Sequence, residues 1–126
     1  MINQPKIRVL IVDDSKTERL IIKEAISGLG FEIFEAENAL DGIQKADEIR
    51  PDLILMDVVM PGMNGFQATK QIKSNDDLKN IPVIMCTSKN QPTDKIWGTR
   101  QGANDYVVKP VKKEELISAI NSALVV

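Results

Sequence analysis

Histidine is absent from this sequence, and cysteine, tyrosine and tryptophan each occur only once. Without histidine there can be no Ser-His or Cys-His nucleophile pair, no histidine zinc site and no phosphohistidine acceptor. A single cysteine cannot form an internal disulfide, and this favours a reducing compartment, so we expect a cytoplasmic protein. Any chemistry must come from carboxylates, hydroxyls, lysines and backbone groups.

Long apolar runs and runs of basic residues are missing as well. No segment approaches the roughly 20 apolar residues that span a bilayer, and the polar start "MINQPK" is too short for a signal peptide. The 16 lysines and arginines are balanced by 18 acidic residues and form no basic stripe. We therefore expect neither membrane insertion nor nucleic-acid binding.

What the chain does contain is enough apolar material for one core. Its 126 residues are 43% hydrophobic, which suits one domain that folds without a disulfide or metal staple. No internal repeat, low-complexity tract or linker interrupts it. We expect residues 1–126 to form a single domain with no effector domain attached.

Short apolar runs alternate with segments of helical periodicity along the whole chain. The runs that read as strands occupy residues 7–12, 31–36, 52–57, 81–87 and 105–109. Helices are expected to begin near Ser15, Asn38, Asn64, Pro92 and Glu114. Most of the runs are continuously apolar, as in strands buried on both faces. The run at 31–36 instead alternates apolar and acidic residues, which is typical of a half-exposed edge strand.

The first helix carries a clear start signal. Ser15 and Glu18 match the S-x-x-E capping box, in which each side chain bonds the other residue's backbone N–H group. The apolar face expected for this helix consists of Ile21, Ile22, Ala25, Ile26 and Leu29.

Five strand-helix units with long crossovers predict a parallel sheet with helices on both faces. The fold class is therefore α/β, a doubly wound (βα)5 arrangement. The flavodoxin-like order 2-1-3-4-5 fits, because it places the alternating run 31–36 at an edge.

Reactive side chains stand where the predicted strands end. They are Asp13, Asp14, Asp57, Thr87 and Lys109. In such a sheet the carboxyl ends of the strands form the ligand site. Three close carboxylates repel one another unless a cation joins them, and Mg²⁺ accepts one or two carboxylates together with phosphate oxygens. The pattern predicts a Mg²⁺ pocket that can hold a phosphoryl group on a carboxylate.

With Tyr106 and the pair Lys109-Pro110 added, these motifs resemble the response-regulator receiver domain of two-component signalling. The resemblance covers essentially the whole chain. It implies that Asp57 is the phosphoacceptor and that Asp14 and Asp57 ligate Mg²⁺ directly. It also implies that Asp13 binds Mg²⁺ mainly through a water molecule and that the backbone carbonyl of Val59 is the remaining protein ligand.

The resemblance assigns a switch to the remaining motif residues. Thr87 would hydrogen-bond the phosphoryl group, Lys109 would pair with it, and Tyr106 would turn into the space that Thr87 leaves. The peptide bond before Pro110 is expected to be cis. The surface formed by the fourth helix, fifth strand and fifth helix would then change and be read by a protein partner.

A narrower resemblance lies in residues 93–103 and in "MPGMNGFQAT" at 60–69. Both are similar to receivers of type IV pilus, or twitching-motility, chemosensory systems of the PilH kind. The partner implied is a sensor histidine kinase like those of chemotaxis, and the protein is expected to be a monomer. Whether it transmits a signal or drains phosphate from a shared kinase stays open, as do its downstream target and the role of Trp97.

Two alternatives are weighed against a phosphorelay response regulator, which is not an enzyme on an external substrate. A Mg²⁺-dependent hydrolase of the haloacid-dehalogenase kind needs a second acid two residues after its nucleophile. That position is Val59 here, and no general acid is expected near Asp57. A phosphate-independent receiver would typically have lost one of the acids or the lysine.

Overall fold

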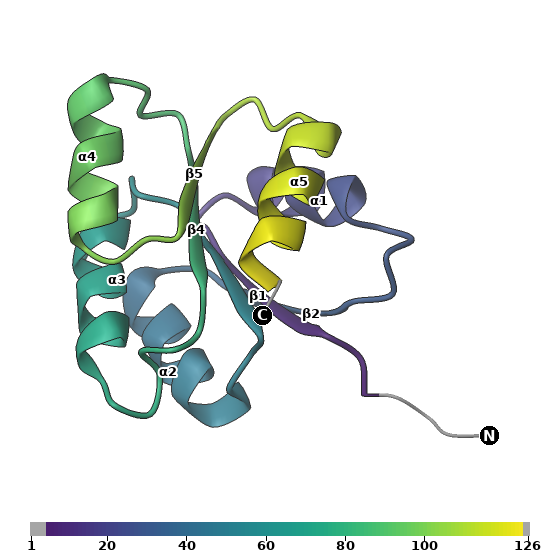
Figure 1. Cartoon of the computed structure of the whole chain (residues 1–126), viewed down its shortest axis with the longest axis horizontal. Coiled ribbons are helices and arrows are strands. Elements are labelled where there is room, and N and C mark those ends of the chain that lie inside the picture. The colour runs from purple at the N-terminus through teal and green to yellow at the C-terminus, as the bar shows by residue number, and fades with distance from the viewer. Residues whose placement is uncertain (1–4, 125–126) are drawn as a thin grey trace.

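Strands and helices alternate strictly along residues 5–124, the part of the chain that the computed structural model describes (Figure 1). The strands are β1 Arg8–Val12, β2 Glu32–Ala36, β3 Leu53–Met56, β4 Val83–Thr87 and β5 Asp105–Val108. The helices are α1 Lys16–Ala25, α2 Ala39–Ile49, α3 Gly65–Ser74, α4 Pro92–Arg100 and α5 Lys113–Leu124.

The five strands form one parallel sheet in the order β2-β1-β3-β4-β5. This confirms the doubly wound order predicted from the sequence, with the alternating strand β2 at an edge. β1 and β3 lie side by side in register, Val12 opposite Met56. The residues that follow these two strands therefore leave the sheet together, at the point where the strand order reverses.

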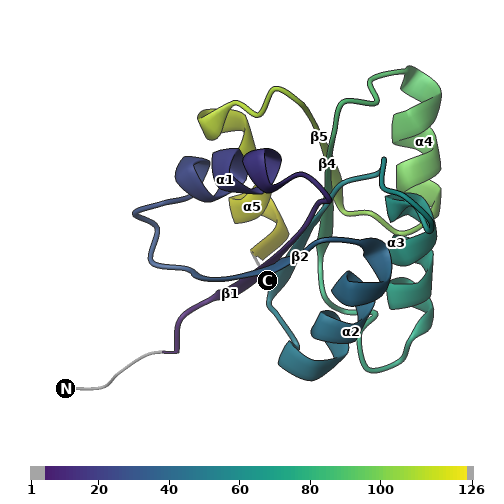
Figure 2. The same cartoon turned by 180° about the vertical axis from the view of Figure 1, so that it is seen from behind.

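Helices cover both faces of the sheet. Figures 1 and 2 show α1 and α5 on one face and α2, α3 and α4 on the other. Each face has its own apolar cluster, one built around Ile22, Ile26, Leu116 and Ile120 and the other around Phe66, Ala68 and Ile72. Apart from Arg8, the residues of the three inner strands β1, β3 and β4 are buried, as their continuous apolar runs predicted.

The predicted apolar face of α1 is partly wrong. Ile22 and Ile26 are buried, but Ile21 and Leu29 are 41% and 42% exposed. The helix ends at Ala25, so Leu29 lies in the following turn, where Gly28 has a φ of 86°. Ile21 lies on the solvent side, and Arg19 takes a buried place on the inner face. Within residues 5–124, no helix is long and apolar enough to cross a membrane.

Candidate functional site

The carboxyl edge of the sheet holds an open pocket of about 670 Å³. It is lined by Asp13, Asp14, Ser15, Glu18, Asp57, Val59, Ser88, Lys109 and Pro110. These residues follow β1, β3, β4 and β5 or begin α1, as the strand ends predicted. Parallel pairing brings the ends of β1 and β3 together although Asp13 and Asp57 are far apart in the sequence.

Three of the lining carboxylates are close enough to share a cation. One oxygen each of Asp13, Asp14 and Asp57 lies within 4.8 Å of the other two. Asp13 and Asp57 are buried, with 1% and 7% exposure, whereas Asp14 is open to solvent. Carboxylate oxygens beside solvent are the donors that a hard divalent ion such as Mg²⁺ prefers, and they leave room for its waters. The donor set therefore fits the predicted metal.

One ammonium group balances this acidic pocket. Lys109 Nζ donates to Asp13 Oδ2 at 2.7 Å, and it lies 3.5 Å from Glu18 Oε2 and 3.8 Å from Asp57 Oδ2. Burial by itself would lower the pKa of Lys109, but the hydrogen bond to Asp13 and the charge of Asp57 raise the pKa above its ordinary value. The lysine is thus held in its charged form beside Asp57.

Asp57 is oriented by its own backbone surroundings. Its Oδ1 accepts a hydrogen bond from the Val58 N–H group at 2.8 Å, and its Oδ2 faces Lys109. Burial raises the pKa of Asp57; the Lys109 ammonium opposes this and the Asp13 carboxylate adds to it. The backbone of Asp57 also packs closely against Gly65, the first residue of α3. A Cβ atom added to Gly65 would stand 1.9 Å from the Asp57 carbonyl oxygen. The chain can pass this closely only because Gly65 has no side chain.

The predicted switch residues are joined through the backbone of Lys89. Thr87, fully buried at the end of β4, accepts the Lys89 N–H group on its Oγ1 at 3.3 Å. The Tyr106 hydroxyl donates to the Lys89 carbonyl oxygen at 2.8 Å. Neither Tyr106 nor Thr87 lines the acidic pocket, but the Thr87 hydroxyl is close enough to Asp57 to lower the pKa of that carboxyl. The link from Tyr106 to Asp57 therefore runs through Lys89 and Thr87. The peptide bond between Lys109 and Pro110 is cis.

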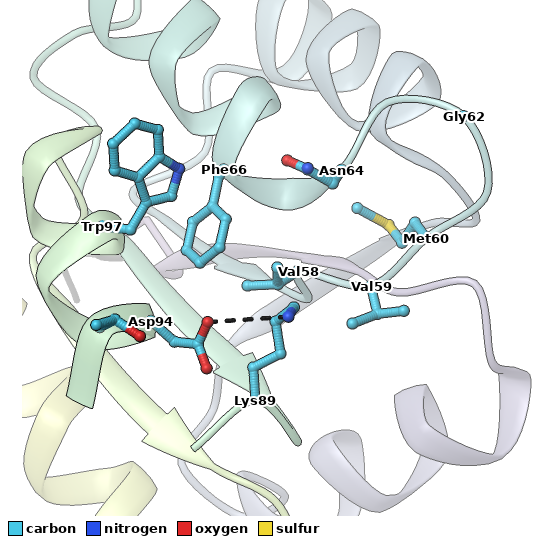
Figure 3. Close-up of a pocket in the computed structure, with 10 residues that line it drawn as sticks. Val58, Val59, Met60, Gly62, Asn64, Phe66, Lys89, Asp94 and Trp97 are labelled. Atoms are coloured by element: carbon cyan, nitrogen blue, oxygen red, sulfur yellow. Dashed lines mark ion pairs between the residues drawn. The ribbon is translucent and has the colours of Figure 1, made fainter. Parts of the chain in front are cut away.

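Figure 3 shows a second pocket, of about 680 Å³. It is lined by Val58, Val59, Met60, Gly62, Asn64, Phe66, Lys89, Thr93, Asp94 and Trp97. In its lining, Lys89 Nζ and Asp94 Oδ1 form an ion pair at 3.8 Å. Val59, which is 54% exposed, lines both pockets. Trp97 is 49% exposed at the pocket wall, so it does not fill the core between helices.

Two residues of this region were missed by the sequence analysis. Glu18, which was assigned only to the helix cap, also lines the acidic pocket. Arg19 is 7% exposed, and its guanidinium donates from Nη1 to the Asp13 carbonyl oxygen at 2.7 Å and from Nε to Glu35 Oε1 at 3.0 Å. Position could have suggested Glu18, because it lies in the first turn of the helix that starts at the site. The burial of Arg19 could not be predicted by looking for apolar residues on one face of the helix.

Comparisons with known proteins agree with this geometry. The sequence model of the response regulator receiver domain matches residues 9–121. The chain is 50% identical to protein PilH of Pseudomonas aeruginosa, over 93% of this chain and 97% of that protein. It is 41% identical to chemotaxis protein CheY of Bacillus subtilis, over 93% and 97%. Among solved structures, chemotaxis protein CheY4 of Vibrio cholerae superposes with a TM-score of 0.88 at 32% identity, over 95% of this chain and 100% of that one.

Proposed function

The chain belongs to the response regulator receiver family, as a phosphorelay response regulator of chemotaxis or pilus signalling, and we propose that Asp57 is its phosphoacceptor. The observation that carries the proposal is the placement of Asp57. It is a buried carboxylate at a strand end that shares one pocket with Lys109 and two further aspartates. The same family membership removes the reason to consider the hydrolase alternative.

In the proposed reaction a carboxylate oxygen of Asp57 attacks the phosphorus atom of the donor. The new P–O bond forms as the bond from phosphorus to the donor's nitrogen or oxygen breaks, and the donor leaves with that electron pair. The Lys109 ammonium, already 3.8 Å from Asp57 Oδ2, stabilises the negative phosphoryl oxygens. Thr87 offers its hydroxyl from the adjacent strand end. These groups stand in place before the donor arrives, which reduces the cost of orienting them.

The residues that would hold Mg²⁺ are Asp13, Asp14 and Asp57, with the backbone carbonyl of Val59. When bound there, the ion would neutralise negative charge on the carboxylates and on the phosphoryl oxygens. The proposal is supported by three carboxylate oxygens within 4.8 Å of one another, a density of like charge that favours a cation.

The proposed output is a change in the surface formed by α4, β5 and α5. A phosphoryl group on Asp57 would draw the Thr87 hydroxyl toward it and weaken the bond that Thr87 accepts from Lys89. Since the Lys89 carbonyl also holds the Tyr106 hydroxyl, the change would pass to β5 and α4. The pull on Thr87 and the turn of Tyr106 remain predictions.

Receiver domains interact with histidine kinases, and we propose a chemotaxis-type kinase as the donor here. A type IV pilus system is the favoured setting, since PilH is among the relatives. One sheet with two apolar clusters, in residues 5–124, supports the prediction that the chain is a single receiver domain. A cytoplasmic location and a monomeric state stay predictions.

The test uses a small phosphodonor. Wild-type protein is incubated with Mg²⁺ and acetyl phosphate, and its intact mass is measured with and without a chelator. We expect one phosphoryl adduct that requires Mg²⁺, none in Asp57→Asn, and an undiminished adduct in Asp76→Asn, an exposed aspartate after α3. A wild type without adduct, or Asp57→Asn with one, would overturn the proposal.

A further inference from the structure

Glu18 departs from the capping box that its sequence position predicts. Half of the box is present, because Ser15 Oγ accepts the Glu18 N–H group at 3.2 Å. The other half is missing: Asp13 Oδ1 accepts the Ser15 N–H group at 2.9 Å, in the place that Glu18 would take. The Glu18 side chain instead lies along the acidic pocket, with Oε2 3.5 Å from Lys109 Nζ. Glu18 is therefore available for a role at the pocket.

Lys109 is shared among three carboxylates, and the phosphoacceptor is the most distant of them. The distances from Nζ are 2.7 Å to Asp13, 3.5 Å to Glu18 and 3.8 Å to Asp57. The Lys109 side chain is only 11% exposed, so water screens these charges less than it would at an open surface. A phosphoryl group on Asp57 must draw the ammonium toward itself against the attraction of the other two carboxylates. Asp13 belongs to the proposed metal site, whereas Glu18 has no part in the proposed reaction.

We propose that Glu18 is an electrostatic brake on phosphorylation. It acts through Lys109, since it competes with the phosphoryl group for that ammonium, and its charge also repels an anionic donor entering the pocket. The same negative charge attracts a divalent cation. Glu18 therefore favours Mg²⁺ and disfavours the phosphoryl group, which sets how readily the site is loaded. The inference rests on the proposed function of Asp57.

The test removes the charge and keeps the shape, in Glu18→Gln. Calorimetric titrations measure the affinity for Mg²⁺ alone and, at saturating Mg²⁺, for beryllofluoride, an unreactive stand-in for the phosphoryl group. We expect beryllofluoride to bind about two- to fivefold more tightly and Mg²⁺ to bind more weakly by a similar factor, the size of a half-exposed ion pair. The initial rate of adduct formation from acetyl phosphate should rise by about the same factor, and the difference should shrink as salt is added.

Glu24→Gln is the matched control. Glu24 is on the same helix, so this variant makes the same change of charge away from the pocket, and we expect neither affinity to move. A merely structural effect of Glu18→Gln would weaken both ligands together, and that result would overturn the inference. The inference would also be overturned if Glu18→Gln bound Mg²⁺ and beryllofluoride with wild-type affinities, or if its adduct formed no faster than that of the wild type. A wild type that forms no adduct at all would instead overturn the proposed role of Asp57, and the brake with it.

Discussion

Helices α3 and α4 lie on the same face of the sheet, but they are attached to it very differently (Figure 1). The buried residues of α3 are Gly65, Phe66, Ala68, Thr69 and Ile72. In α4 the only buried residue is Gly98, while Ile96 and Trp97 are about half exposed. α3 also begins directly behind Asp57, through the close approach of Gly65 to its carbonyl. We infer that α3 is the fixed support of the site and that α4 is the element a small change can move.

The connections of α4 support this division. Gly98 rests against the rings of Tyr106 and Phe66, and Asp94 forms an ion pair with Lys89 in the lining of the second pocket. Lys89 in turn carries the backbone bonds to Thr87 and Tyr106. α4 is thus joined to the acidic pocket by a few polar contacts, whereas α3 is joined to it by packing. Packed cores resist displacement, and isolated hydrogen bonds of roughly 1 kcal/mol each can be exchanged.

The sharpest test replaces one glycine in each helix by alanine. In Gly65→Ala the new Cβ would overlap the Asp57 carbonyl oxygen, at 1.9 Å, so we expect a loss of about 3 kcal/mol or more in the free energy of unfolding. In Gly98→Ala the nearest atom is Tyr106 Cδ2 at 3.3 Å. The helix propensity gained, about 1 kcal/mol, should offset that contact and leave stability within about 1 kcal/mol of wild type. Urea denaturation measures both, and equal losses would contradict the comparison.

A second pair of variants compares the side chains that face the sheet and the solvent. Ile72→Ala in α3 removes a fully buried side chain and should cost about 2–5 kcal/mol of unfolding free energy. Ile96→Ala in α4 removes a side chain that is 55% exposed and should change stability by less than about 0.5 kcal/mol. The slope of unfolding free energy against urea concentration should be equal in both variants, so that their unfolding midpoints can be compared directly. A large cost for Ile96→Ala would mean that α4 is held by packing after all.

The features that could be predicted from the sequence are those that depend on local pattern and on strand topology. β1 and β3 could be located because strands buried on both faces must be continuously apolar. Asp13, Asp57, Thr87 and Lys109 could be brought together because parallel strands end at one edge of the sheet. Both inferences depend on local pattern and topology, which a single sequence carries.

The features that the sequence did not reveal depend on contacts between distant side chains. The capping box predicted for Glu18 was locally sound, but Asp13 takes the Ser15 N–H group and Lys109, across the sheet edge, takes the Glu18 carboxylate. Arg19 is buried because the Asp13 carbonyl and Glu35 of the neighbouring strand both accept its N–H groups. Leu29 was assigned to a helix that stops four residues earlier. Side-chain partners decided the cases of Glu18 and Arg19 over local preference, whereas Leu29 was lost to the turn at Gly28.

The smallest expected effect is on the titration of Tyr106, the only tyrosine of the chain, which lies next to α4. Burial raises the pKa of Tyr106 to about 12, and the charges of Asp94 and Asp57 add to it. In the unfolded chain the pKa should be about 10. Because the folded pKa is the higher one, Tyr106 contributes stability that is present below about pH 10 and is lost as the pH rises toward the folded value.

Near-ultraviolet absorbance of the tyrosinate follows this titration directly. Asp94→Asn should lower the midpoint, because it removes a neighbouring negative charge from α4, whereas Asp76→Asn, after α3, should leave it unchanged. A native midpoint at the ordinary value of about 10 would show that Tyr106 is not held against Lys89 and α4. In that case the hydrogen bond between β5 and the loop before α4 could not carry a change from Thr87, and α4 would lose its link to the acidic pocket.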